Sequence, residues 1–461
     1  MFYKIIILLN LVTTALAAQD YSMLEQFYLK ASNVDANTGG DGGDAFGYSV
    51  AIDGNTMVVG ARLEDGIDNL TTNSGAAYVF VKNNGIWTEQ AYLKAPSPSS
   101  TDFFGHAVAI SGDTIAVGAH LDNFSGMSNT GAVYIFTRSQ EVWSFQAKLT
   151  AENPSSNAFF GYSISLDSGT LLVGAYKEDT DAIVDSGAAY VFVGAGASWT
   201  QQSKLTADML GTGIGASDSF GSSVSLYANT AVVSAIDEDG IDDGNENNSG
   251  AVYVFQRAGT TWSSQAYLKA SNLDALDLFG KSVAIFEDTL VISAPNEDGD
   301  SNNMVATGAV YIFTRSGVIW TEQTILRSYN SGASDLFGTS VAIDNDVIVV
   351  GAKFEDGDGI DGLDNNNTFN SGAAYVFIKA NSSIQQTYLK ASNADPRDEF
   401  GFAVAISGNT IVVGAPDEDS AEANNPDDNT FESNSTPFIK GAGAAYVFPA
   451  DLVFSNGFEV P

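Results

Sequence analysis

Residues 46–61, FGYSVAIDGNTMVVGA, contain two short runs of β-branched, aromatic and small residues, separated by the turn Asp-Gly-Asn at 53–55. Turn residues between such runs are typical of a β-hairpin. A second pair of runs follows, GAAYVFV at 75–81 and WTEQAYLKA at 87–95. The stretch therefore predicts four short antiparallel strands, a to d in chain order, with a longer acidic segment between the second and the third.

The same pattern recurs along the chain, and every copy opens with a Phe-Gly pair. These pairs are 58, 56, 60, 59, 58 and 63 residues apart. They begin at Phe46, Phe104, Phe160, Phe220, Phe279, Phe337 and Phe400. Strands b and c are apolar at consecutive positions, so both faces of each small sheet must be covered. Repeats with this period favour small sheets stacked face to face around an axis, as in a β-propeller.

The two ends of the repeat array complement one another. The seventh copy has strands at 400–406, 410–415 and 443–448, but no fourth strand follows them. Before the first copy, residues 24–31 (LEQFYLKA) resemble a strand d, because they match TEQAYLKA at 88–95. We therefore expect an all-β fold, a seven-bladed β-propeller of four-stranded antiparallel blades. The N-terminal strand is expected to complete the last blade and close the ring.

The segments outside the repeats are short. Residues 1–17 combine Lys4, an apolar run and an Ala-x-Ala site ending at Ala17, a pattern typical of a signal peptide. The apolar run is short for the alternative, an uncleaved membrane anchor. We predict a signal peptide at 1–17, one propeller domain at 18–448 and a C-terminal tail at 449–461. The protein is accordingly expected to be exported, either secreted or held at the cell surface.

Charge excludes several classes of protein. The chain has 56 acidic and 19 basic residues and a net charge of −37, whereas nucleic-acid binding requires clustered Lys and Arg. The same charge argues against direct binding to anionic lipid. The chain has no cysteine, which excludes disulfides, thiolate nucleophiles and Cys-bound zinc. Two histidines leave few candidates for imidazole catalysis.

The carboxylates are concentrated at one end of the predicted blades. Antiparallel strands place the segments between strands b and c (the b–c loops) on the same face as the segments from strand d to the next strand a (the d–a links). The b–c loops contain 29 acidic residues and the d–a links contain 13, so 42 of the 56 lie on this loop face. Crowded carboxylates favour bound cations, because like charges raise one another's pKa and destabilise the compact state.

The repeats resemble the FG-GAP family, the module of the integrin α-subunit propeller. Phe-Gly occurs in all seven copies; Gly-Ala-Pro is complete at 414–416 and nearly so in Ser-Ala-Pro at 293–295. The resemblance implies a seven-bladed propeller. Integrin-type repeats hold calcium between strands a and b, but here that link is a tight turn with too few carboxylates. The chain is more similar to the shorter form of bacterial exported proteins, so the integrin calcium positions do not transfer to it.

The b–c loops supply the candidate metal ligands. The densest is DGDGIDGLD at 356–364, where alternating Gly allows the loop to fold back and direct several carboxylates at one ion. Oxygen ligands of this kind suit calcium. The candidate ligands are Asp356, Asp358, Asp361, Asp364, Asp65, Asp68, Asp239, Asp242, Asp298 and Asp300. The alternative is a solvated acidic surface that maintains solubility.

Other recurring residues have structural interpretations. A basic residue near the end of strand d is expected to pair with an adjacent acidic loop rather than form a ring of cationic contacts. These residues are Lys30, Lys94, Lys148, Lys204, Lys269, Arg327 and Lys390. Tryptophans that open strand d in five blades are expected to pack between blades. His106 occupies the position of Tyr48 and Tyr162 in other copies and is expected to pack or line the channel, and His120 ends a strand b.

We therefore expect a non-enzymatic binding or adhesion module, monomeric, without catalytic residues. Its calcium-loaded loop face would recognise an extracellular protein or glycan, because a rigid propeller presents many loops together. The alternative is a secreted polysaccharide hydrolase or lyase with its site at the mouth of the channel. The scarcity of histidine and the uniformity of the repeats argue against that alternative.

Overall fold

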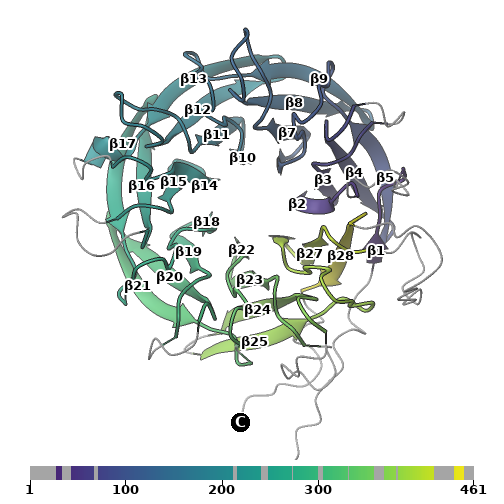
Figure 1. The fold of residues 1–461 in the computed structure, drawn as a ribbon, viewed down its shortest axis with the longest axis vertical. Helices are drawn as coiled ribbons and strands as arrows, with labels where there is room; N and C mark the ends of the chain where they lie inside the picture. Colours follow the sequence, from purple (N-terminus) through teal and green to yellow (C-terminus); the bar gives the residue numbers. More distant parts are fainter. Residues whose placement is uncertain are drawn as a thin grey trace, which may run out of the picture.

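The computed structural model describes residues 27–33, 43–66, 71–210, 215–239, 248–272, 274–299, 305–330, 332–357, 368–380, 383–419 and 441–450. Within these ranges the chain forms seven four-stranded antiparallel sheets and one short 3-10 helix, Ala207–Leu210. The sheets stand around a common axis as the blades of a propeller (Figure 1). The predicted all-β, seven-bladed fold is confirmed. No helix in these ranges is long and apolar enough to cross a membrane.

Every blade contributes one strand to each of four concentric layers (Figure 1). The innermost strands are β2 (Phe46–Asp53), β6 (Ala107–Ser111), β10 (Ser163–Asp167), β14 (Phe220–Tyr227), β18 (Val283–Phe286), β22 (Ser340–Asp344) and β26 (Ala403–Ser407). The second strands are β3 (Thr56–Ala61), β7 (Thr114–Ala119), β11 (Thr170–Ala175), β15 (Thr230–Ala235), β19 (Thr289–Ala294), β23 (Val347–Ala352) and β27 (Thr410–Ala415). The third strands are β4 (Ala76–Asn83), β8 (Ala132–Ser139), β12 (Ala188–Ala195), β16 (Ala251–Ala258), β20 (Ala309–Ser316), β24 (Ala373–Ala380) and β28 (Ala444–Pro449). The outermost strands are β5 (Ile86–Leu93), β9 (Val142–Leu149), β13 (Ser198–Leu205), β17 (Thr261–Leu268), β21 (Ile319–Leu326), β25 (Ser383–Leu389) and β1 (Phe27–Leu29).

The last blade combines both ends of the described chain. Its sheet has the order β1-β28-β27-β26, so its outermost strand precedes blade 1 in sequence. β1 pairs antiparallel with β28, and Phe27 lies opposite Val447 while Leu29 lies opposite Ala445.

The Phe-Gly motif sets the contact between adjacent blades. The phenyl ring of Phe104 is fully buried, and its backbone N–H donates to Ser74 O of blade 1 at 3.0 Å. Gly105 has a φ of +89°, and a Cβ there would overlap the carbonyl oxygen of Ala76 in blade 1. The same backbone bond joins Phe46 to Ala442 O, between blades 1 and 7, at 3.1 Å. The motif therefore requires glycine for both conformation and close approach.

These contacts also explain where the inner strands begin. Strand a was expected to start at each Phe, but β6 starts at Ala107 and β26 starts at Ala403. Phe104 and Phe400 instead form isolated parallel bridges with Gly75 and Gly372 of the preceding blades.

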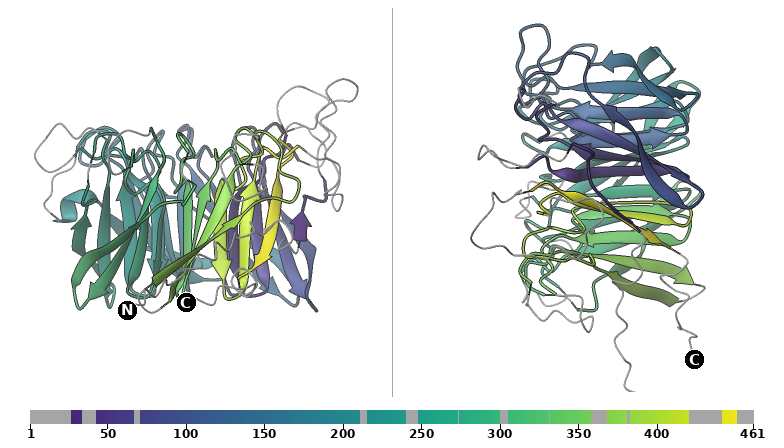
Figure 2. Two further views of the ribbon diagram at one scale, coloured as in Figure 1. Left: turned by 90° about the horizontal axis from the view of Figure 1, so that it is seen from below. Right: turned by 90° about the vertical axis from the view of Figure 1, so that its right-hand side faces the viewer.

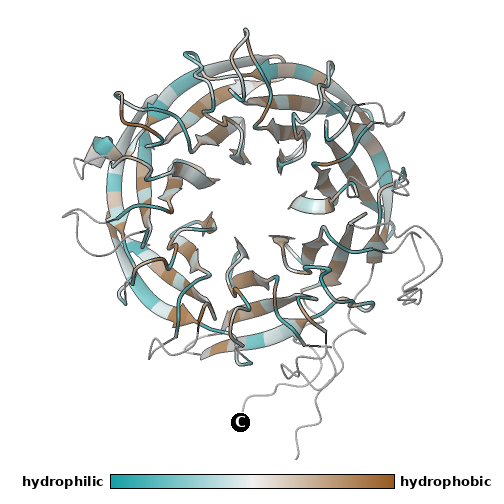
Figure 3. Ribbon diagram, viewed as in Figure 1, coloured by the Kyte–Doolittle hydropathy of each residue, from teal (hydrophilic) through white to brown (hydrophobic). Residues whose placement is uncertain are grey.

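The hydrophobic core lies between the blades. One cluster joins Val58 and Val79 of blade 1 to Ile115 and Val117 of blade 2, all of them fully buried. Apolar residues accordingly dominate the two middle layers of strands, while polar residues gather on the outer strands and the loops (Figure 3). The tryptophan of strand d contributes to this packing, because Trp143 is buried in the same cluster.

Seen edge-on, the strands run along the axis between two different faces (Figure 2). The turns joining the first strand to the second, and the third to the fourth, are short, as in the β2–β3 turn between Asp53 and Thr56. The b–c loops and d–a links lie together on the opposite face, as antiparallel connectivity requires.

We predict that Gly105→Ala destabilises the protein much more than Gly112→Ala. Both glycines have positive φ, but a Cβ on Gly112 meets nothing within 4 Å. The Gly112 change should lower the free energy of unfolding by about 1 kcal/mol from φ strain alone. The clash at Gly105 should add about 1–3 kcal/mol more, measured by urea unfolding. Equal losses would contradict the role assigned to the Phe-Gly contact.

Candidate functional site

An ion pair with a buried carboxylate lies at the loop-face end of every blade. A carboxylate at the start of the b–c loop pairs with the basic residue near the end of the outermost strand of the same blade. The seven pairs are Glu64–Lys94, Asp122–Lys148, Glu178–Lys204, Glu238–Lys269, Glu297–Arg327, Glu355–Lys390 and Glu418–Lys30. The predicted pairing of these basic residues with acidic loops is therefore confirmed.

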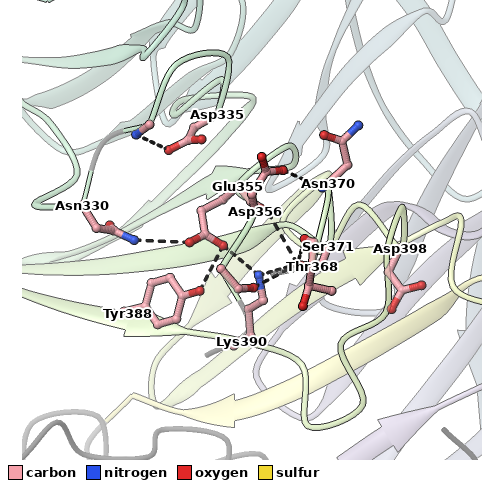
Figure 4. Close-up of polar contacts among 12 residues, drawn as sticks. Asn330, Asp335, Glu355, Asp356, Thr368, Asn370, Ser371, Tyr388, Lys390 and Asp398 are labelled. Carbon is pink, nitrogen blue, oxygen red and sulfur yellow. Dashed lines mark hydrogen bonds and ion pairs between the residues drawn. The ribbon is translucent and has the colours of Figure 1, made fainter. Parts of the chain in front are cut away.

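Blade 6 shows the complete arrangement (Figure 4). Lys390 Nζ lies 2.7 Å from Glu355 Oε2, and the two side chains are 2% and 0% exposed. Tyr388 OH donates to Glu355 Oε2 at 3.0 Å, and Asn330 Nδ2 from the preceding link donates to Oε1 at 3.2 Å. Lys390 Nζ also donates to Ser371 Oγ at 2.7 Å. Burial lowers the pKa of Lys390, and the charge of Glu355 opposes that change.

The residue after each paired carboxylate closes the base of the b–c loop. In blade 6, Asp356 Oδ1 accepts the backbone N–H of Asn370 at 2.7 Å, and Glu355 O accepts that of Gly372 at 2.9 Å. Each equivalent residue accepts a backbone N–H in the same way; these acceptors are Asp65, Asn123, Asp179, Asp239, Asp298 and Asp419. Hydrogen bonds therefore hold together the two ends of each b–c loop where it joins the blade.

Four of the ten predicted metal ligands, Asp65, Asp239, Asp298 and Asp356, are among these loop-base acceptors. The other six lie outside the described residues: Asp68, Asp242, Asp300, Asp358, Asp361 and Asp364. Within the described ranges, no three His, Asp or Glu side chains are grouped so that they could hold a metal ion. Calcium binding by the loops stays a prediction.

A buried aspartate in most d–a links adds to the charge near the ion pairs. These residues are Asp44, Asp102, Asp218, Asp277, Asp335 and Asp398; Ala158 stands at this position before blade 3. Burial, with a smaller contribution from Glu297, raises the pKa of Asp277 to about 7. Asp277 Oδ2 accepts the N–H of Asp274 at 3.2 Å, which opposes that rise. The pKa of Asp277 is therefore raised first by burial and only second by repulsion from neighbouring carboxylates.

A second cluster breaks the sevenfold regularity at the inner ends of blades 1 to 3. It is made by the residues after Phe-Gly and after strand b. We call it the inner crescent and define it as Tyr48, Arg62, His106, His120, Tyr162 and Tyr176. The equivalent positions in blades 4 to 6 hold Ser222, Lys281 and Thr339 after Phe-Gly, and Ile236, Pro295 and Lys353 after strand b.

The crescent brings the two histidines of the chain together. The ring centroids of His106 and His120 are 4.0 Å apart, and Tyr162 lies 4.8 Å from His106. Burial lowers the pKa of His120 to about 3 and that of His106 well below its ordinary value. The charge of Arg62 lowers both pKa values further. Both imidazoles are therefore neutral at physiological pH.

From the sequence, His106 and His120 were assigned separate positions, and contact between the two imidazoles was not predicted. His106 packs beside the inner ends of strands, as expected, but His120 lies against it from the next strand of the same blade. Aligning the seven copies and reading the two positions after Phe-Gly and Gly-Ala as columns would have found the cluster, because aromatic and basic residues gather there in blades 1 to 3.

This geometry defines a propeller with a regular loop face and one irregular patch near its axis. A model of the FG-GAP repeat matches the chain seven times, at residues 36–80, 87–136, 143–192, 199–255, 262–313, 320–377 and 384–431. The chain belongs to the FG-GAP repeat family. The second match runs from β5 of blade 1 to β8 of blade 2, so the family's repeat spans the contact between blades. No curated protein matches the chain.

We predict that Lys390→Met lowers the free energy of unfolding by about 3–5 kcal/mol, because it leaves the Glu355 carboxylate buried without its cation. Lys177→Met is the matched control: its pair with Asp185, at 3.3 Å, is 27% and 36% exposed. Exposed pairs contribute at most about 1 kcal/mol, so the control should change little. Urea unfolding of both variants measures the difference, and a loss at Lys390 no larger than the control would contradict the role of the pair.

We predict that Asp277→Asn stabilises the protein more at pH 8 than at pH 4. The raised pKa means that the folded state binds a proton more tightly than the unfolded state. The associated stability is complete below the ordinary pKa of about 4 and is lost as the pH rises through about 7. An asparagine resembles the protonated acid and removes this loss.

Urea unfolding across pH 4–8, in chelator, tests the prediction at Asp277. Exposed Asp346 supplies the control Asp346→Asn, which should not change the pH profile. A profile of Asp277→Asn parallel to that of the wild type would contradict a raised pKa at this position.

Proposed function

We propose that the protein is an exported, monomeric, non-enzymatic binding module whose loop face recognises an extracellular protein or glycan. The observation that supports this most is the fixed base of the b–c loops. In blade 6 the loop begins at the buried Glu355 and is held by Asp356, and the arrangement recurs around the ring. Loops carried on such rigid supports suit recognition, because little order has to be gained on binding.

Calcium is the proposed cofactor of this face. The b–c loop and d–a link segments of the sequence contain 42 of the 56 acidic residues of the chain. The seven paired basic residues each engage one carboxylate at the start of a loop, so we expect the acidic residues further along a loop to be neutralised by other cations or by solvent. Calcium accepts six to eight oxygen ligands from flexible loops, which fits this composition.

The alternative function, a secreted polysaccharide hydrolase or lyase, has one observation in its favour. The neighbouring His106 and His120 distinguish the inner end of blade 2 from those of the other blades. Their lowered pKa values disfavour a general acid at neutral pH, because such an acid must carry a proton to give. The binding module remains the function that we propose.

We predict that calcium raises the melting temperature of the protein relative to chelator. A ligand that binds only the native state stabilises it by about 2.7 kcal/mol at 100 times its Kd. Magnesium at the same concentration controls for general screening of the acidic face. Identical melting temperatures in calcium and in chelator would contradict calcium binding.

We predict that the protein binds a component of an array of extracellular proteins and glycans without turning it over. The loop variant with Asp358, Asp361 and Asp364 changed to Asn should weaken that binding while the melting temperature in chelator stays unchanged. Asp346→Asn, on the opposite face, is the control. Reducing-end release from polysaccharides by the wild type, lost in His120→Gln, would favour the hydrolase or lyase instead.

A further inference from the structure

The inner crescent holds a positive charge that has no carboxylate partner within the described residues. Arg62 lies at the end of β3 on the loop face and is half-buried. Its guanidinium carbon stands 3.8 Å from the ring centroid of Tyr48 and 5.5 Å from that of Phe103. Aromatic faces attract cations, but they do not replace a hydrogen-bonded anion. In a chain of net charge −37, an unpaired arginine is available for an anion from outside.

Unpartnered nitrogen atoms gather at the same place. Arg62 Nε, His106 Nδ1 and His120 Nδ1 are buried and have no hydrogen-bond partner among the described residues. His106 is 8% exposed and His120 is 7% exposed. Buried polar groups without a partner each cost about 1–3 kcal/mol, so the crescent is destabilising as it stands and would be stabilised by a ligand or water that supplies partners.

The charge around the histidines excludes a metal cation as the favoured occupant. His106 is close enough to Arg62 and to Lys281 for both positive charges to lower its pKa. The imidazoles otherwise contact the rings of Tyr48, Tyr162, Phe103 and Phe159. The carboxylates of Glu399 and Asp237 act on Tyr48 and Tyr162, respectively. A cation at the imidazoles would be repelled by Arg62 and Lys281, whereas an anion would be attracted.

We propose that the inner crescent binds a carboxylate-bearing sugar, a uronate residue of an acidic glycan. The Arg62 guanidinium would bind the carboxylate, for which its planar fork is suited. Neutral imidazoles each offer one donor and one acceptor, which match sugar hydroxyls. The tyrosine rings of blades 1 to 3 would pack against the apolar face of the sugar ring. The inference rests on the proposed binding function and names the ligand chemistry of its axial part.

The experiment titrates the full-length protein with D-glucuronate in 0.15 M salt and follows binding by saturation-transfer NMR. D-glucose is the uncharged probe, and benzoate is a carboxylate on a ring without hydroxyls. We expect glucuronate to bind with a Kd near about 1 mM, and both other probes to bind at least about tenfold more weakly. Benzoate equal to glucuronate would overturn the sugar assignment, and glucose equal to glucuronate would overturn the role of the charge.

Two variants locate the site. Arg62→Gln should weaken glucuronate binding at least about tenfold, since it removes a charge-assisted hydrogen bond. Arg62→Lys, which keeps the charge without the fork, should give an intermediate loss and guards against misfolding of the first variant. Arg397→Gln is the matched control: Arg397 is an exposed arginine in a d–a link of the same face, and its loss should leave binding unchanged.

The outcomes separate this inference from the proposed function. Glucuronate binding that is unaffected by Arg62→Gln and Arg62→Lys overturns the crescent site, while binding elsewhere on the loop face still agrees with a binding module. Absence of glucuronate binding to the wild type overturns the inference, and the array of proteins and glycans then tests the module independently. Loss of binding in Arg397→Gln equal to that in Arg62→Gln would mean a general charge effect and would also overturn it.

Discussion

The loop face depends on one interaction, the ion pair between a buried carboxylate at the start of a b–c loop and the basic residue near the end of the outermost strand. In blade 6 the Glu355 carboxylate also accepts hydrogen bonds from Tyr388 and Asn330. One buried charge thus joins the loop, the outer strand and the preceding link. Removing either partner in this blade leaves the other charge buried without its counter-charge, which is strongly destabilising.

The ion pairs and the Phe-Gly contacts stabilise different parts of the ring. Phe-Gly sets the distance between blades near the axis, where Gly105 lies against the backbone of Ala76. The ion pair holds the outer part of the same blade end. Lys30 directly follows β1, the outermost strand of blade 7. It pairs with Glu418, so blade 7 has the same ion pair as the other blades.

The fold could be predicted because its constraints are local and repeated: the Phe-Gly period and the hairpin turns each report on a backbone requirement. The basic residue near the end of each outermost strand could be paired with an acidic loop because it, too, recurs in every repeat. The role of the Asp-Gly loops is harder to predict from sequence. An aspartate that accepts a backbone hydrogen bond at the base of a loop, such as Asp356, looks the same in the sequence as one that would ligate calcium. The inner crescent was missed because its members, such as Arg62 and His120, are 58 residues apart and depart from the repeat.

The central claim is that all seven b–c loops rise from bases tied to the ring, and amide hydrogen exchange in the full-length protein tests it most directly. The backbone N–H groups concerned donate to the side-chain oxygens of the loop-base acceptors; they belong to Asn73, Asn129, Asp185, Asn248, Ala306, Asn370 and Gly441. The account predicts protection comparable to that of the second and third strands. Exchange at the rate of an unprotected loop in these amides would contradict it.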